Sequence, residues 1–323
     1  MRQKDGKSSK KFSAGDAFSV EERWRNGKRV GCVNMQIGVL NTLVDDGDCF
    51  QKVRDFGVEV CQLVSWDHTQ ANPRMAGNVL RYSRAAKIRI SAMWAGLPPP
   101  QIWDFQLGPL TLGIVPRAFR AERVAVLKRW ADFAAAAEIP AIVTHCGFIP
   151  ENLSDPEYPS VVETIREVAE YCSRQGIGFW LETGQETPVV LLRTIERVGM
   201  DNIGVNLDPA NLIMYGKGNP VDALDVIGPY VRNVHVKDGL YPTNGDRLGH
   251  EVRVGEGKVN FPAFLSRLSD IGFAGELIIE REISGAEQDR DIRDTIRYLQ
   301  EWFARQTPAA AGREPNVQGR GQT

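Results

Sequence analysis

Short apolar runs alternate with longer amphipathic stretches along most of this chain, and this alternation restricts the fold more than any other feature. Eight runs, rich in β-branched and large apolar residues, have the length of buried strands: 30–36, 58–64, 88–94, 141–146, 177–182, 203–208, 231–237 and 276–280. Stretches between them carry apolar residues at helical spacing, as in 116–137, 156–175, 187–198, 261–271 and 288–304. Eight repeats of strand and helix predict a parallel sheet with helices outside it.

We therefore expect an α/β fold in which the sheet closes into a single (β/α)8 TIM barrel. An open dinucleotide-binding sheet is disfavoured, because no G-x-G-x-x-G sequence follows the first predicted strand. The barrel is predicted to occupy residues 29–306 as one catalytic domain. Residues 1–28, rich in lysine, arginine, serine and glycine, predict a flexible N-terminal arm, and residues 307–323 predict a disordered C-terminal tail.

Composition and charge narrow the classes of partner. The formal net charge of −2 gives no basic excess, so we expect no nucleic-acid partner. No apolar run approaches the ~20 residues that a membrane span needs, and the N-terminus lacks the apolar core of a secretory signal. Five cysteines without a C-x-x-C pair predict free thiols in a reducing compartment. We expect a cytoplasmic protein with a small-molecule partner.

Acidic and imidazole side chains stand at the ends of the last four predicted strands. These are Glu182, Asp208, His235 and Glu280. Each alone is readily explained as a solvated loop residue or a helix cap. Neighbouring strands of a closed barrel end side by side, however, so the four are expected to converge. Three carboxylates and one imidazole suit one divalent metal ion, Mn²⁺ first and Mg²⁺, Co²⁺ or Zn²⁺ as alternatives.

Other residues at the same rim are candidates for contacts with substrate, although each has an ordinary packing or loop role as its alternative. His145, at the end of strand four, is placed for proton transfer. The candidates for substrate binding are Trp66, His68, Trp94, Glu186, Asn211, Lys237 and Arg253, with Arg247 as an alternative to Arg253. The Gly255–Gly257 run is expected to form a turn rather than a phosphate cradle. The 96–117 loop is expected to be a lid or a contact in a homo-oligomer.

Five stretches, 180–188, 204–220, 231–239, 254–265 and 275–282, resemble the xylose-isomerase-like sugar isomerase/epimerase superfamily. The resemblance is to its bacterial sugar phosphate isomerase/epimerase branch and covers roughly residues 30–305. It implies that the four strand-end residues hold one divalent metal. It also implies that Glu182 and Glu280 face opposite sides of a bound sugar as catalytic acid and base groups.

Two departures from the family pattern leave the reaction open. Tagatose-epimerase-like members commonly carry D-x-x-H, whereas this chain has Asp208 followed by Asn211, which cannot carry a proton at neutral pH. Lys237 also stands where epimerases often bring other residues. The main expectation is isomerisation or epimerisation of a keto-sugar or sugar acid through a metal-stabilised enediolate. The alternative is a lyase or dehydratase that eliminates a β-substituent from a 3-keto-glycoside or inosose.

Two further classes are less well supported. A DNA-repair endonuclease on the same barrel needs a histidine-rich multi-zinc centre, and this chain has only four histidines and no basic excess. A non-catalytic sugar-binding barrel would have no need of a complete set of four ligands. We therefore expect an enzyme that acts on a small carbohydrate.

Overall fold

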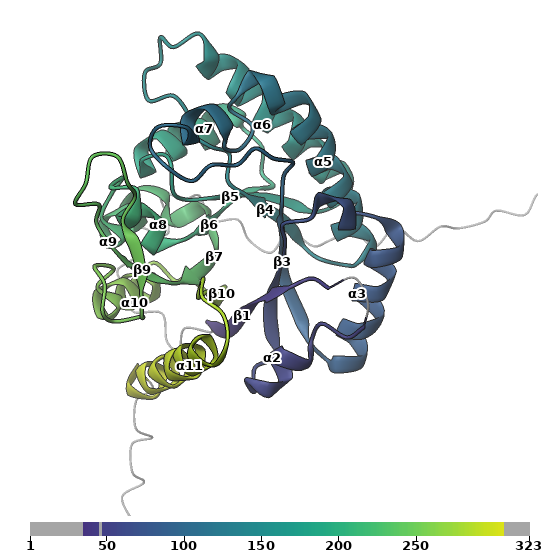
Figure 1. Cartoon of the computed structure of the whole chain (residues 1–323), viewed down its shortest axis with the longest axis vertical. Helices are drawn as coiled ribbons and strands as arrows, with labels where there is room; N and C mark the ends of the chain where they lie inside the picture. The colour runs from purple at the N-terminus through teal and green to yellow at the C-terminus, as the bar shows by residue number, and fades with distance from the viewer. Residues whose placement is uncertain (1–34, 45–46, 307–323) are drawn as a thin grey trace, which may run out of the picture.

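Eight parallel strands close into one barrel in the order β1-β10-β7-β6-β5-β4-β3-β2 (Figure 1). The structure is a computed structural model and describes residues 35–44 and 47–306. The barrel strands are β1 (Gln36–Thr42), β2 (Val60–Ser65), β3 (Arg89–Ala95), β4 (Ala141–Thr144), β5 (Gly178–Glu182), β6 (Ile203–Leu207), β7 (Val231–Val236) and β10 (Glu276–Ile279). The predicted single (β/α)8 barrel is confirmed. The predicted arm 1–28 and tail 307–323 lie outside the described residues.

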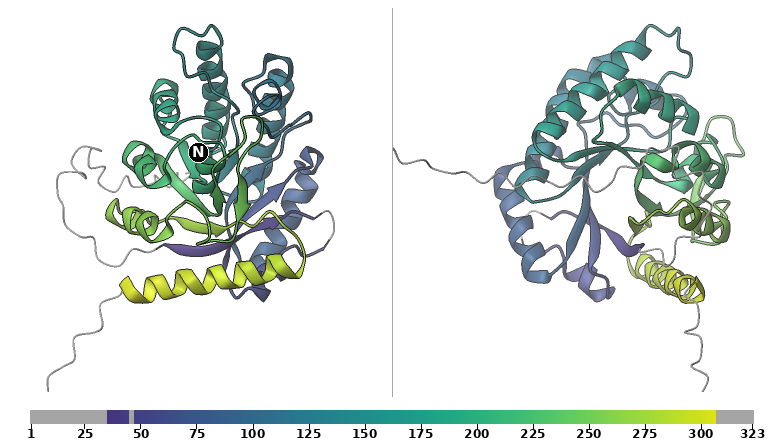
Figure 2. Two further views of the ribbon diagram at one scale, coloured as in Figure 1. Left: turned by 60° about the vertical axis from the view of Figure 1, so that its left-hand side comes forward. Right: turned by 180° about the vertical axis from the view of Figure 1, so that it is seen from behind.

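Most of the helices cover the outside of this barrel, and the shortest one lies in the loop after β3 (Figure 1). The helices are α2 (Gln51–Asp55), α3 (Pro73–Ala86), α4 (Gly108–Thr111), α5 (Arg117–Ala136), α6 (Glu157–Arg174), α7 (Pro188–Val198), α8 (Pro209–Met214), α9 (Pro220–Ile227), α10 (Phe261–Asp270) and α11 (Ala286–Gln306), with 3-10 turns η1 (His68–Gln70) and η2 (Gly228–Tyr230). Figure 2 shows α11 lying along β1, so the last described helix supports the first strand. Among the described helices, none is long and apolar enough to cross a membrane.

The first strand is not where the sequence pattern predicted it. The prediction was 30–36, whereas β1 begins at Gln36 and continues to Thr42; residues 30–34 lie outside the described residues. The sequence of β1 carries Gly38 and Asn41, which break its apolar pattern. Both have structural reasons. A Cβ on Gly38 would lie 2.8 Å from the Val60 carbonyl oxygen, and Asn41 donates to the Cys49 carbonyl at 2.9 Å.

The barrel has two separate apolar cores because side chains alternate along each strand. The larger core lies between the strands and the helices. The smaller one fills part of the barrel interior and consists of Val64, Ala92, Trp94, Ala141 and Val143. Three amide side chains, Gln62, Asn206 and Asn233, are also fully buried. Part of the barrel interior is therefore polar, on strands β2, β6 and β7.

A long loop after β3 extends over the carboxyl end of the barrel. Arg123 of α5 is fully buried and fixes this loop, because its guanidinium donates to the carbonyls of Pro98, Pro100, Thr111 and Gly113. The tip of the loop reaches the loop after β8 (Asp238–Leu240), where Gln106 donates to Asp246 at 3.1 Å. Phe105 also packs on Tyr215 after α8. The role of this loop as a lid or as a contact in a homo-oligomer stays a prediction.

A short antiparallel hairpin follows β7 at the same rim. It pairs β8 with β9 (His250–Val252). The carboxylate of Asp238 accepts hydrogen bonds from the backbone N–H groups of Gly239, Gly255, Gly257 and Val259. The glycine-rich run after β9 is thus a turn fixed by a buried carboxylate, as predicted.

The tight packing of Gly38 predicts a loss of stability when a methyl group is added. We expect Gly38→Ala to lower the free energy of unfolding by about 1–3 kcal/mol, because the new Cβ would lie 2.7 Å from Ile278 Cδ1 as well as against the Val60 carbonyl. Gly77→Ala is the matched control. Gly77 lies inside α3 with open space around it, so alanine there should raise stability by about 0.5–1 kcal/mol. Urea unfolding measures both; equal stability of Gly38→Ala and wild type contradicts this account.

Candidate metal centre

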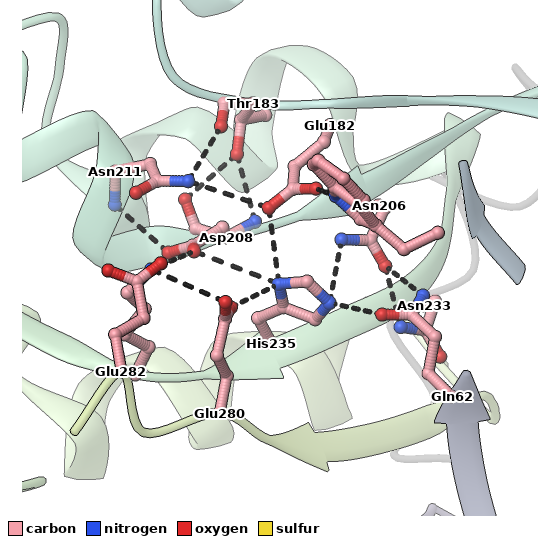
Figure 3. Close-up of polar contacts among 12 residues, drawn as sticks. Gln62, Glu182, Thr183, Asn206, Asp208, Asn211, Asn233, His235, Glu280 and Glu282 are labelled. Carbon is pink, nitrogen blue, oxygen red and sulfur yellow. Dashed lines mark hydrogen bonds and ion pairs between the residues drawn. The ribbon is translucent and has the colours of Figure 1, made fainter. Parts of the chain in front are cut away.

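Four side chains from neighbouring strand ends meet at the carboxyl rim of the barrel (Figure 3). Glu182 ends β5, Asp208 follows β6, His235 lies near the end of β7, and Glu280 follows β10. Each offers one ligand atom, and these atoms all lie within 4.8 Å of one another. All four residues are buried. The convergence expected from the strand ends is therefore present.

Nδ1 of His235 lies at the centre of this group. It is 2.7 Å from Glu280 Oε2, 3.3 Å from Glu182 Oε1 and 3.7 Å from Asp208 Oδ2. Yet Nδ1 of His235, Oε2 of Glu280 and Oδ2 of Asp208 are buried atoms that make no well-aligned hydrogen bond. Buried polar atoms normally have partners. Three carboxylates and an imidazole directed at one point have the chemistry of a divalent-cation site, so the residues fit the metal that the family implies.

Local structure fixes the orientation of Asp208. This residue is the N-cap of α8, and its Oδ1 accepts from the backbone N–H of Asn211 at 2.9 Å. Its backbone is held by Thr183, whose hydroxyl donates to the Asp208 carbonyl at 2.8 Å and accepts from the Asp208 N–H at 2.9 Å. Because capping uses one carboxylate oxygen, the other is left free to face the histidine.

Glu182 is held from the opposite side of the site. The indole Nε1 of Trp94 donates to its Oε2. Its Oε1 lies 3.5 Å from His145 Nε2, and the side-chain amide of Asn211 approaches the same oxygen at 3.5 Å. Trp94, His145 and Asn211 were all predicted at this rim. The structure brings each of them into contact with a candidate metal ligand.

Lys237 is a second cation in this buried cluster. Its Nζ lies 3.5 Å from Asp208 Oδ2, 3.5 Å from Glu280 Oε1 and 2.7 Å from Glu282 Oε1. Burial lowers the pKa of this amine, but the surrounding carboxylates outweigh burial and hold the pKa well above its usual value. The lysine therefore stays charged and offsets part of the repulsion among the acids.

The histidines differ because their neighbours differ. Burial lowers the pKa of His235, yet Glu280 and Glu182 outweigh it and raise the pKa well above its usual value. Burial is the dominant effect on His145, whose pKa is lowered despite the nearby Glu182. For Glu182, burial raises the pKa, but His145 and His235 together bring it below its ordinary value.

Aromatic rings line the side of the site next to β2 and β3. Trp66 contacts Trp94 with ring centroids 4.5 Å apart and Trp103 at 6.1 Å, while Trp103 contacts the His145 ring at 5.1 Å. Trp66 is 55% exposed, which is unusual for so large an apolar side chain. Trp66 and Trp94, both predicted at this rim, are thus in contact, and Trp103 of the 96–117 loop adds a third ring.

Four residues that follow β4, β5 and α8 carry buried polar atoms without a well-aligned hydrogen bond. They are Gln185, Glu186, Tyr215 and His145, the last through Nδ1. All four residues are buried. Burial raises the pKa of Glu186 to about 8, so this carboxyl holds its proton near neutral pH. Hydroxyl-bearing ligands satisfy such donors and acceptors better than anions do.

Three other candidates for substrate contact make no described interaction with the four candidate ligands. Arg253, 45% exposed at its side chain, pairs with Asp291 at 3.0 Å and Asp294 at 2.8 Å on α11. His68 lies in η1 and makes no contact with the four candidate ligands among the interactions described. Arg247 forms an isolated bridge with Asn244 in the loop after β8.

Sequence reasoning also missed several residues of the site and of the buried hydrogen-bond network beside it. They are Gln62, Thr183, Gln185, Asn206, Tyr215, Asn233 and Glu282. A signal existed for four of them. Gln62, Asn206 and Asn233 are amides inside strands that are largely buried, and Glu282 follows Glu280 at the two-residue spacing that keeps side chains on one face.

A closed parallel barrel with such a ligand group at its carboxyl rim defines a TIM barrel with a candidate divalent-metal centre. The xylose isomerase-like TIM barrel family matches residues 50–302, and the chain belongs to this family. A "xylose isomerase domain protein" from Planctomyces limnophilus is 34% identical, with a TM-score of 0.80, over 85% of this chain and 100% of that one.

More distant structures share the barrel alone. A 3-keto-D-glucoside 4-epimerase from E. coli is 16% identical with a TM-score of 0.64, covering 83% of this chain and 99% of that one. A probable 3-DHS dehydratase from Bacillus anthracis is 17% identical with a TM-score of 0.60, covering 81% of this chain and 98% of that one.

An uncharacterized protein of Methanocaldococcus jannaschii is a relative in sequence. It is 30% identical over 48% of this chain, and the match spans only 53% of that relative.

The buried carboxyl of Glu186 predicts a specific pH dependence of stability. Its folded pKa of about 8 lies above the value of about 4.3 expected in the unfolded chain. The folded state therefore binds the proton more tightly, so the stabilisation is complete below about pH 4 and is lost as the pH rises through about 8. We expect the stability of wild type relative to Glu186→Gln to fall by up to about 1.4 kcal/mol per pH unit over this range.

Urea unfolding of both proteins in EDTA, at several pH values, measures this difference. EDTA removes the contribution of metal binding from the comparison. A difference that does not change with pH would show that Glu186 is ionised throughout.

Proposed function

We propose that this protein is a divalent-metal-dependent sugar isomerase or epimerase that moves a proton at the carbon next to a carbonyl group. The observation that carries the proposal is the buried group of Glu182, Asp208, His235 and Glu280, with ligand atoms within 4.8 Å of one another. Nδ1 of His235, Oε2 of Glu280 and Oδ2 of Asp208 are buried there without a well-aligned hydrogen bond. Membership of the xylose isomerase-like family supports the same assignment.

Asp208 and His235 are proposed as plain metal ligands, and Glu182 and Glu280 as ligands that also transfer protons. When bound, a divalent cation, Mn²⁺ first, supplies the Lewis acid that stabilises negative charge on a carbonyl oxygen. The two glutamates stand on β5 and β10, which are separated in the barrel by β6 and β7. This separation supports removal of a proton by one carboxylate and delivery by the other, as the family resemblance implies.

The surroundings favour an uncharged, hydroxyl-rich substrate. The partnerless polar atoms of Gln185, Glu186 and Tyr215 are suited to sugar hydroxyls. Lys237, in contrast, already contacts three carboxylates and has little capacity left for a phosphate. The rings of Trp66 and Trp94 offer an apolar surface for the face of a sugar. We propose a keto-sugar or sugar derivative as the substrate.

A second candidate function is β-elimination on a 3-keto-glycoside or inosose-like compound. It is favoured by Asn211, which lies beside Glu182 but cannot carry a proton, and by His145, a further proton carrier 3.5 Å from the same glutamate. In this reaction one residue removes the proton next to the carbonyl and His145 protonates the leaving oxygen. A barrel of this fold occurs in a probable dehydratase as well as in epimerases.

The proposed acid and base residues predict strong losses of turnover. Glu182→Gln and Glu280→Gln should each reduce turnover by at least about a hundredfold, because an amide cannot accept the substrate proton. Exchange of the substrate C–H for deuterium in D₂O, followed by NMR with a panel of ketoses and 3-keto-glycosides, measures this. Glu163→Gln, an exposed change on α6, is the control and should have wild-type turnover. Full exchange in either active-site variant argues against that glutamate.

Metal removal gives an independent prediction. EDTA should abolish turnover, and Mn²⁺ should restore it with one ion per chain by calorimetry, because the four ligands form one group. Product analysis in the same reactions separates the two candidate functions. An epimer labelled at one carbon supports the isomerase/epimerase, whereas an unsaturated ketone with a released aglycone supports the lyase. The cytoplasmic location and a homo-oligomeric state remain predictions.

A further inference from the structure

Beneath His235, a chain of three amide side chains runs across the barrel interior. Gln62 comes from β2, Asn206 from β6 and Asn233 from β7, and all three are fully buried. Amides inside a barrel have to be hydrogen-bonded to offset their loss of water. Figure 3 shows them on the edge of the His235 ring that faces away from the carboxylates. Neither proposed reaction gives these three amides a role.

The hydrogen bonds fix which end of each amide donates and which accepts. Gln62 Nε2 donates to Asn206 Oδ1 at 3.2 Å, and Asn233 Nδ2 donates to the same oxygen at 2.6 Å. With its amide nitrogen used in this way, Gln62 turns its carbonyl oxygen to His235, 2.6 Å from Nε2. At that distance two unprotonated acceptors would repel each other, so Nε2 carries a proton and donates it.

The second neighbour of Nε2 is itself a donor, so the shorter contact to Gln62 decides the assignment. The Asn206 amide nitrogen lies 3.1 Å from Nε2, the longer of the two contacts. An amide nitrogen is a donor only, so it cannot accept the Nε2 proton. Gln62 is thus the acceptor for that proton. With Nε2 protonated, the lone pair of a neutral imidazole is on Nδ1, the atom that faces Glu182, Asp208 and Glu280.

We propose that Gln62 is a positioning residue, whose carbonyl accepts the Nε2 proton of His235 and so presents Nδ1 to the metal ion. The inference rests on the metal site of the proposed function. Gln62 hydrogen-bonds to none of the three carboxylates among the described interactions, and it acts through the histidine. Partners of this kind fix the tautomer and the ring orientation of a ligating imidazole, and their loss typically weakens metal binding by about 10–100-fold.

Metal affinity tests the role with three variants. Gln62→Met keeps the length of the side chain but removes the acceptor, so Mn²⁺ binding by calorimetry should weaken by about 10–100-fold. Gln62→Glu keeps an acceptor oxygen, so its Mn²⁺ affinity should stay within about threefold of that of wild type. Asn233→Leu is the matched control. Asn233 is equally buried and donates to the same Asn206 oxygen, but it makes no hydrogen bond to His235. The Mn²⁺ affinity of Asn233→Leu should therefore also stay within about threefold of that of wild type.

The hydrogen bond itself is tested without metal. Protein labelled with ¹⁵N-histidine should show a slowly exchanging Nε2–H signal in EDTA, assigned to His235 by its loss in His235→Gln. The signal should disappear in Gln62→Met and remain in Gln62→Glu and Asn233→Leu. A purely structural role for Gln62 would not produce this pattern, because Asn233→Leu disturbs the same core.

These two measurements separate the inference from the proposed function. Failure of wild type to bind Mn²⁺, Mg²⁺, Co²⁺ or Zn²⁺ would overturn the metal site and, with it, the role given to Gln62. If wild type binds metal, unchanged affinity in Gln62→Met overturns the inference alone. Should Gln62→Met not fold, the wild-type spectrum still decides, because a rapidly exchanging Nε2 proton on His235 overturns the assignment.

Discussion

Closure of eight parallel strands into one barrel forces the last residues of neighbouring strands together, and the chemistry of this protein depends on that constraint. Glu182, Asp208 and Glu280 are brought within a few ångströms of one another and are buried. Like charges at such distances repel strongly when water is excluded. The structure answers with the buried cation Lys237, with the imidazole of His235 directed at the carboxylates, and with buried carboxylate oxygens that make no well-aligned hydrogen bond and suit a metal ion.

The features that could be predicted from the sequence are those that depend on the spacing of apolar residues along the strands. Seven of the eight barrel strands lie at the predicted places to within about two residues, since their apolar runs reflect burial on both faces. Strand ends then located the four candidate ligands. The exception, β1, lost its pattern at Gly38 and Asn41, whose identities are dictated by close contact with β2 and by a hydrogen bond to the loop after β1.

What the sequence could not supply is mainly the partners of side chains across the barrel. Gln62 and His235 are 173 positions apart and meet only because β2 and β7 face one another across the interior. Arg253 looked like a substrate contact in the sequence, yet acidic residues of α11 lie close enough to pair with it. Strand position therefore predicts which residues reach the rim, whereas their hydrogen-bond and ionic partners depend on closure.

The hydrogen bonds of the Arg123 guanidinium affect the energetic cost of ligand binding under the loop that follows β3. It satisfies four backbone carbonyls of that loop from below, so the loop is already assembled before any ligand arrives. A preassembled loop loses little conformational entropy on binding. The free energy of substrate binding should then include little cost for ordering this loop, whose Phe105 and Gln106 already contact neighbouring residues of the rim.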